Sequence, residues 1–164
     1  SATAAVAGPQ GIRTIPVADF CMAPGETVLR PGELLISLHI PPPACHSGAR
    51  YLRFIPRGEM DIAVAGAGAW LALEPNNTTI AGARIALSAV APTPLWVKAA
   101  GEALTGKMPS EQTFAEAAAI AQEAAHPIND ARGTMAQRCH LVGVLTRRAL
   151  QGALRRAKGE TCDD

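Results

Sequence analysis

Residues 51–63 (YLRFIPRGEMDIA) gather the charged side chains whose spacing is suited to chemistry. Arg53 and Arg57 stand four residues apart, and the acids Glu59 and Asp61 follow in a short turn. One interpretation is an edge strand whose arginines pair with these acids. The other is a cationic lip beside an anionic or electron-accepting ring. The residues by themselves leave both interpretations open.

Signatures of catalysis are absent from the sequence. It contains no serine elbow, no phosphate-binding loop and no HExxH motif. Cys139 stands next to His140, but adjacent residues of a helix point to different faces, so they do not form a nucleophile pair. The other histidines are scattered, and the cysteines show no CxxC spacing. We therefore expect no catalytic residue and no metal site in this chain.

Residues 65–69 (AGAGA) superficially resemble a dinucleotide-binding fingerprint. The third glycine of that fingerprint is missing, and the run lies inside a strand-like segment with no helix following at the right place. Small side chains in a strand instead allow another backbone or a ring to pack closely. We expect close packing here rather than nucleotide binding.

Composition excludes two kinds of partner. The formal net charge of the 164 residues is +1, which gives no electrostatic footprint for nucleic acid. The longest apolar run, residues 62–73, is too short and too rich in glycine and alanine to span a bilayer. The chain shows no signal peptide, so we expect a cytoplasmic protein with reduced cysteines. These cysteines are Cys21, Cys45, Cys139 and Cys162.

The first two thirds of the chain are strand-like. Residues 33–40 (ELLISLHI) form one expected strand, which three consecutive prolines end. Three more runs, residues 49–56, 62–73 and 79–90, are separated by turn-forming residues. They predict a three-stranded antiparallel sheet in which strands adjacent in sequence pair with each other.

The last third has helical periodicity. We expect a short helix over residues 95–104, a second helix from an N-cap at Ser110 to about Ala125, and a third over residues 132–158. The third helix carries an apolar stripe of Met135, Cys139, Val142, Leu145, Ala149 and Leu150. Its basic residues indicate either a solvated helix face or a docking surface for an acidic subunit. They are Arg138, Arg147, Arg148, Arg155, Arg156 and Lys158. Strands followed by helices indicate the α+β class.

Several short motifs occur in a characteristic order along the chain. They are PGELL at 31–35, YLRFIPRGEMDIA at 51–63, ARIALSAVAPTP at 83–94, HPINDARG at 126–133 and RCHLV at 138–142. In this order they resemble the FAD subunit of the xanthine dehydrogenase and aerobic carbon monoxide dehydrogenase family. Upstream, residues 11–20 (GIRTIPVADF) resemble the close of that family's flavin-binding domain.

The resemblance implies a domain organisation and a partial cofactor site. Residues 1–43 would be the carboxyl-terminal remnant of a flavin-binding α+β domain with its linker, and residues 44–164 the carboxyl-terminal domain, a three-stranded antiparallel sheet with a small helix bundle. The family positions near the flavin correspond to Leu35, Arg53, Arg57 and Asp61. Both glycine-rich phosphate loops of the family would precede Ser1, so we expect a fragment, a proteolytic product or a separately encoded half.

The resemblance also implies a function and partners. The chain would be part of an electron-transfer subunit that passes electrons from [2Fe–2S] clusters through FAD to an external acceptor. Molybdopterin and the clusters would reside on a molybdenum subunit and an iron–sulfur subunit, and the missing amino-terminal half would complete the FAD site. The alternative is a non-catalytic assembly domain that binds no flavin by itself.

Overall fold

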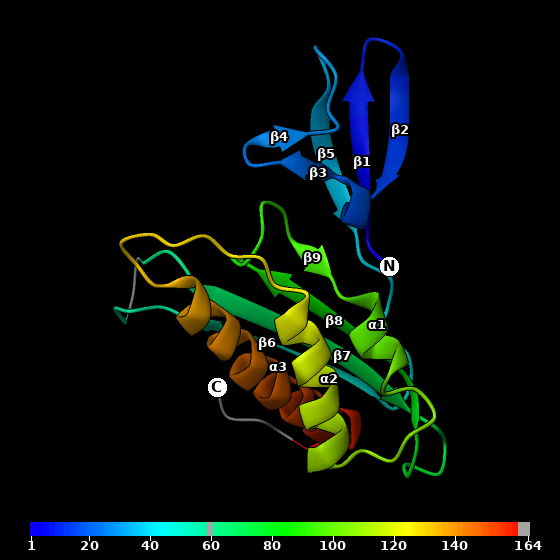
Figure 1. The fold of residues 1–164 in the computed structure, drawn as a ribbon. Helices are drawn as coiled ribbons and strands as arrows, with labels where there is room; N and C mark the ends of the chain where they lie inside the picture. The colour runs from blue at the N-terminus through cyan, green and yellow to red at the C-terminus, as the bar shows by residue number, and fades with distance from the viewer. Residues whose placement is uncertain (59–60, 161–164) are drawn as a thin grey trace. The chain divides into compact units, whose positions relative to one another are not determined.

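The computed structural model describes residues 1–58 and 61–160 (Figure 1). They form two compact units that divide between Pro43 and Ala44. The prolines at 41–43 directly precede this division. The assignment of the first unit to a flavin-binding domain stays a prediction.

The amino-terminal unit is built on a three-stranded antiparallel sheet. β1 (Thr3–Gly8) lies in the centre, with β2 (Gly11–Pro16) on one side and β5 (Leu34–His39) on the other. The core is small, with Ala4, Val6 and Ile15 as its buried apolar residues. All six residues of β5 are exposed.

A short irregular segment connects β2 to β5. It contains a 3-10 turn (Val17–Asp19) and a hairpin of β3 (Cys21–Ala23) and β4 (Glu26–Thr27). Gly25 lies between the two short strands with φ +75°, a conformation that glycine adopts without steric cost.

The carboxyl-terminal unit contains an antiparallel sheet in the order β6-β7-β8-β9. β6 (Ser47–Phe54), β7 (Ala65–Leu73) and β8 (Ile80–Ser88) are the three long strands, as expected from the sequence. β9 (Leu95–Trp96) adds a fourth, short strand that was not expected. Alternate residues of β7, from Ala65 to Leu73, are buried on one face of the sheet.

Three helices follow and cover that face of the sheet (Figure 1). They are α1 (Lys98–Glu102), α2 (Glu111–Glu123) and α3 (Met135–Ala157). α3 packs against β6 and β7, α1 against β8, and α2 against α3. The α+β class and the helices on one side of an antiparallel sheet are therefore confirmed.

The helix starts follow capping chemistry. Ser110 Oγ accepts from the amide of Thr113 at 3.2 Å, and Thr113 Oγ1 accepts from the amide of Ser110 at 2.9 Å. This reciprocal capping box starts α2 where the sequence predicted it. α3 starts at Met135, later than predicted, because Asp130 and Gly133 first close a tight turn.

The segment 95–104 differs from the expected helix. Leu95 and Trp96 pair with β8, and the amide of Val97 donates to the carbonyl of Ile85 at 2.9 Å. Aromatic and β-branched residues favour extended backbone, so the helix is confined to the five residues of α1.

Candidate functional site

Arg57 and Asp61 lie in the connection between β6 and β7. Arg57 Nε donates to Asp61 Oδ2 at 3.3 Å, and the Arg57 side chain is 84% exposed while that of Asp61 is 9% exposed. This ion pair is what the edge-strand interpretation predicts for Arg57. Among the described residues only Nε of Arg57 has a side-chain hydrogen-bond partner.

Asp61 also holds the backbone that follows it. Its Oδ1 accepts from the amide of Ile62 at 2.8 Å. This hydrogen bond lowers the pKa of the Asp61 carboxyl, and the Arg57 guanidinium lowers that pKa further. Asp61 is therefore ionised and fixed, and its carboxylate orients the side chain of Arg57.

The other two predicted site residues take no part in this ion pair. Arg53 lies on β6 opposite Gly66 of β7 and is exposed, with no side-chain partner among the described residues. Leu35 belongs to the amino-terminal unit, on β5 opposite Val6, and is 43% exposed. Glu59, the other acid of the predicted turn, lies outside the described residues.

Arg53 shares its sheet face with an aromatic residue that the sequence did not single out. The face of the sheet opposite the described helices carries Tyr51, whose hydroxyl lies 3.0 Å from Ser88 Oγ. A side chain on Gly66 would meet the Tyr51 hydroxyl at 2.6 Å, and one on Gly68 would meet the ring at 3.6 Å. The run AGAGA thus accommodates a ring, as expected.

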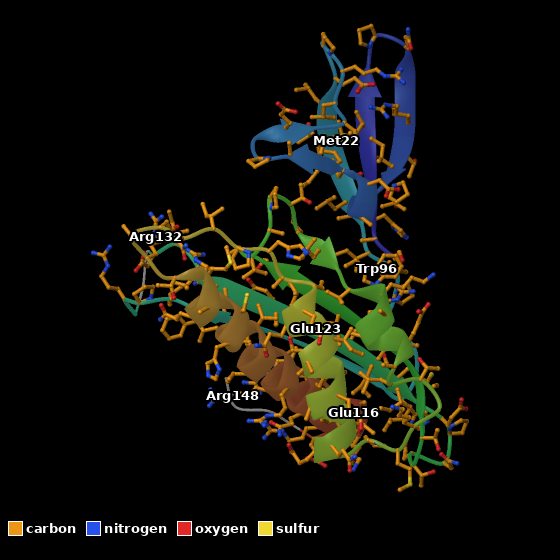
Figure 2. The ribbon with its side chains drawn as sticks, viewed as in Figure 1. Met22, Trp96, Glu116, Glu123, Arg132 and Arg148 are labelled. Atoms are coloured by element: carbon orange, nitrogen blue, oxygen red, sulfur yellow. The ribbon has the colours of Figure 1, made fainter. Side chains whose placement is uncertain are left out.

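Two tryptophans extend this helix-free face. Trp70 on β7 lies opposite Arg84 on β8, and the guanidinium carbon of Arg84 is 5.6 Å from the centroid of the Trp70 ring. That distance is within the range of a cation–π interaction. Trp96 on β9, opposite Ala86, is 51% exposed (Figure 2).

Arg138 corrects one prediction. The sequence placed it among the basic residues of α3 that face solvent or a partner, yet it is only 4% exposed. Its Nη1 donates to the carbonyls of Val64 at 2.7 Å and Ala89 at 3.2 Å, and its Nη2 donates to Asp130 Oδ1 at 2.7 Å. The other five basic residues are exposed, Arg148 among them (Figure 2). Arg138 is buried because three connections of the chain meet at its guanidinium.

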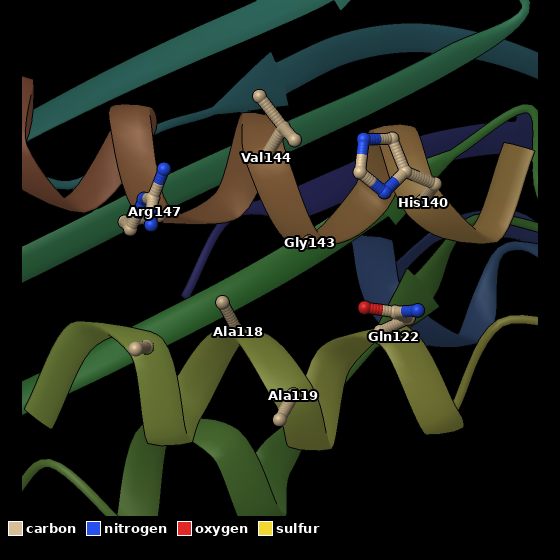
Figure 3. Close-up of a pocket in the computed structure, with 8 residues that line it drawn as sticks. Ala118, Ala119, Gln122, His140, Gly143, Val144 and Arg147 are labelled. Carbon is tan, nitrogen blue, oxygen red and sulfur yellow. The ribbon is translucent and has the colours of Figure 1, made fainter. Parts of the chain in front are cut away.

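A groove of about 250 Å³ runs between α2 and α3. Figure 3 shows Gln122 on the side of α2 that faces α3, opposite His140 and Gly143. A Cβ added to Gly143 would meet Gln122 Oε1 at 2.8 Å, so the glycine allows close approach of the two helices. No carboxylate, thiol or hydroxyl is among the residues that line this groove. It offers no acid–base pair.

A second hollow, of about 330 Å³, lies in the amino-terminal unit beside the ion pair of Arg13 and Glu33. The described part of the chain contains no cluster of three metal-ligating side chains and no helix suited to crossing a bilayer. Cys21, Cys45 and Cys139 are free thiols, and Cys162 lies outside the described residues.

Comparison with known proteins gives a consistent result. Residues 50–153 match the model of the CO dehydrogenase flavoprotein C-terminal domain. The carbon monoxide dehydrogenase medium chain of Afipia carboxidovorans is 34% identical over 151 residues, which are 92% of this chain and 51% of that protein. A xanthine dehydrogenase FAD-binding subunit of Escherichia coli O157:H7 is 29% identical over 154 residues, 93% of this chain and 52% of that subunit.

Solved structures agree with the sequence relatives. A chain of the Cu,Mo-CO dehydrogenase superposes with a TM-score of 0.88 at 33% identity, over 94% of this chain and 53% of that one. Quinoline 2-oxidoreductase from Pseudomonas putida 86 gives a TM-score of 0.86 at 32% identity, over 95% and 53%. The chain spans about half the length of the relatives it matches. Together, the sheet with its three helices and the match over residues 50–153 establish that this chain belongs to the CO dehydrogenase flavoprotein C-terminal domain family.

Proposed function

We propose that this chain is part of the FAD-containing electron-transfer subunit of a molybdenum hydroxylase. The observation that carries the proposal is similarity along more than nine tenths of the chain to proteins named as the medium chain of carbon monoxide dehydrogenase and the FAD-binding subunit of xanthine dehydrogenase. When bound, FAD would accept electrons from iron–sulfur clusters and pass them to an external acceptor. Hydroxylation would occur on a separate molybdenum subunit, so no residue of this chain would catalyse it.

The partner that we propose first is the polypeptide that corresponds to the other half of the relatives. Its surface of contact would include β5, where Leu34, Ile36 and Leu38 are 71%, 52% and 57% exposed. Exposed apolar residues grouped on one strand indicate a surface that another chain segment covers. An iron–sulfur subunit and a molybdenum subunit would complete the complex. The free thiols of the described cysteines suit the cytoplasm, the compartment that we propose.

Leu35, Arg53, Arg57 and Asp61 are the residues that we assign to the flavin. Leu35 would pack on the ring, and the two arginines would lie near the edge where negative charge collects on reduction. The exposed side chain of Arg57 suits such a contact. We propose that these residues contact one edge of the ring and leave the pyrophosphate to the other half of the subunit.

The reduction potential of FAD bound to the complete subunit tests these assignments. A unit charge about 4 Å from the ring is worth on the order of 4 kcal/mol at an effective dielectric constant near 20, before screening by solvent. Arg57→Met and Arg53→Met should each lower the potential by tens of millivolts, since about 30 mV corresponds to about 1.4 kcal/mol for two electrons.

The assembly-domain alternative predicts a different outcome. If Arg57 serves only its ion pair with Asp61, Arg57→Met changes thermal stability and leaves the flavin potential unchanged. An unchanged potential in both arginine variants would remove these residues from the flavin site. A complete subunit that purifies with its partners but without flavin would support the assembly role instead.

A further inference from the structure

We propose that Arg138 is a positioning residue that fixes residues 61–64 of the β6–β7 connection and, through Asp61, its ion-pair partner Arg57. The inference rests on the proposed function only in taking the flavin as the group that this connection contacts. The positioning itself rests on the geometry around Arg138. The structure describes residues 55–58 and 61–64 of the connection.

The connection is held at one end by two consecutive links. The amide of Val64 donates to the carbonyl of Phe54 at 2.9 Å and closes the connection at its base. The carbonyl of the same Val64 accepts from Arg138 Nη1 at 2.7 Å, and Val64 is fully buried. Only two residues separate Val64 from Asp61, so a displaced Val64 carries Asp61 and its partner Arg57 with it.

Arg138 is itself held in place by Asp130, which lies in the connection between α2 and α3. Asp130 Oδ1 accepts from Arg138 Nη2 at 2.7 Å and also from the amides of Arg132 at 2.8 Å and Gly133 at 3.2 Å. The hydrogen bond from Arg138 is the largest reason that the pKa of Asp130 is lowered. The carboxylate is therefore charged and oriented when it receives the guanidinium.

The third contact of Arg138 reaches the β8–β9 connection. Nη1 also donates to the carbonyl of Ala89, a non-glycine residue with φ +62°. Such a conformation persists where its surroundings enforce it. Arg138 Nε is buried without a hydrogen-bond partner among the described residues, so the two Nη atoms alone orient the group. One guanidinium thus joins three connections at the same end of the sheet.

Hydrogen exchange on the chain tests the positioning without any cofactor. The amides of Ile62 and Val64 report on the connection, and the amide of Leu71, in the middle of β7, reports on opening of the sheet. Arg138→Gln should speed exchange at Ile62 and Val64 by about tenfold or more relative to Leu71, because charge-assisted hydrogen bonds to a buried carbonyl are lost. Phe114→Leu, a core change in α2, should speed all three amides alike.

A second variant covers the case in which Arg138→Gln does not fold. Asp130→Asn keeps the shape of the acceptor and removes its charge, so it should loosen the same two amides by a smaller factor. Arg138→Lys should also give an intermediate result, because one ammonium cannot donate in three directions with guanidinium geometry. Equal acceleration at Ile62, Val64 and Leu71 in the Arg138 and Asp130 variants would overturn the inference and leave Arg138 as a general stabiliser.

The flavin-loaded subunit then separates this inference from the proposed function. If both hold, Arg138→Gln lowers the flavin potential in the same direction as Arg57→Met, and the double variant shows no further fall. Phe114→Leu should leave the potential unchanged. If Arg57→Met has no effect on the potential while the exchange pattern holds, the flavin assignment fails and the positioning role stands.

Discussion

Arg13 and Glu33 meet across the central strand of the amino-terminal sheet. Arg13 Nε donates to Glu33 Oε1 at 2.8 Å and its Nη2 to Oε2 at 2.7 Å, although β2 and β5 lie on opposite sides of β1. Gly8 of β1 makes room for the pair, since an added Cβ would lie 2.7 Å from Glu33 Cγ. A bidentate ion pair therefore spans a sheet that has little apolar core.

This ion pair predicts a pH dependence. The hydrogen bond from Arg13, supported by the amide of Arg30, lowers the pKa of Glu33 from its ordinary 4.5 to about 2. A carboxyl with a lowered pKa stabilises the fold fully above its ordinary pKa, and that stabilisation is lost as the pH falls toward the folded-state value. Stability of the amino-terminal unit should thus decline between pH 4.5 and 2.

Glu33→Gln should remove this dependence. The variant should be less stable than the parent at pH 7, and the two should converge near pH 2. Urea unfolding followed through the amide signals of Ala4 and Val6 would measure it. Glu26→Gln, at an exposed position of β4, is the matched control and should follow the parent at every pH. Parallel curves for the parent and Glu33→Gln would contradict the prediction.

Gly48→Ala should destabilise the carboxyl-terminal unit. An added methyl group would meet the carbonyl of Ala153 and lie 2.5 Å from the amide nitrogen of Ala157, both in the backbone of α3. Because a helix backbone cannot rotate away, β6 and α3 must separate, at a cost of about 1–3 kcal/mol. Gly58→Ala, where no atom of the described residues lies within 4 Å, should change stability little. Thermal unfolding of the two variants provides the comparison.

Ser110→Ala should weaken the start of α2. The variant loses the acceptor for the Thr113 amide and half of the capping box, which costs about 1 kcal/mol. Ser110→Asp retains an acceptor at the N-cap and should recover most of the stability. Chemical denaturation monitored by far-ultraviolet circular dichroism is a suitable measurement. Equal midpoints for the alanine and aspartate variants would show that the cap contributes nothing measurable.

The 164-residue chain should bind FAD weakly or not at all. Much of the affinity for a dinucleotide comes from hydrogen bonds to its pyrophosphate, and the residues that we assign to the flavin contact only the ring. Calorimetric titration of the chain with FAD measures this directly. Submicromolar affinity would mean that the chain contains a complete flavin site.

The main elements of the fold could be read from the sequence because local chemistry determines them. Turn-forming residues separate the strands β6, β7 and β8, and Ser110 with Thr113 marks the start of α2. The short strand β9 could not be predicted, because two residues carry no periodicity. Only its pairing with Ala86 and Leu87 makes it a strand.

The surroundings of the site were harder to predict. The sequence analysis grouped Arg138 with the basic residues of α3 that face solvent or a partner. Yet Arg138 continues the apolar stripe of Val142, Leu145 and Ala149, because the successive spacings from 138 to 149 are four, three and four residues. A charge on an apolar stripe is the signal that could have identified it. Its partners Val64 and Ala89 lie 74 and 49 residues away, and only the tertiary fold brings them together.

The exposed strand β5 has a consequence for the chain when it is produced by itself. Within the described residues β5 pairs only with β1, so its outer edge presents unpaired backbone groups beside Leu34, Ile36 and Leu38. A long apolar edge of this kind is a template for strand addition between molecules. Concentrated preparations of the chain alone should therefore aggregate through this edge, and co-expression with the complementary half should protect against it.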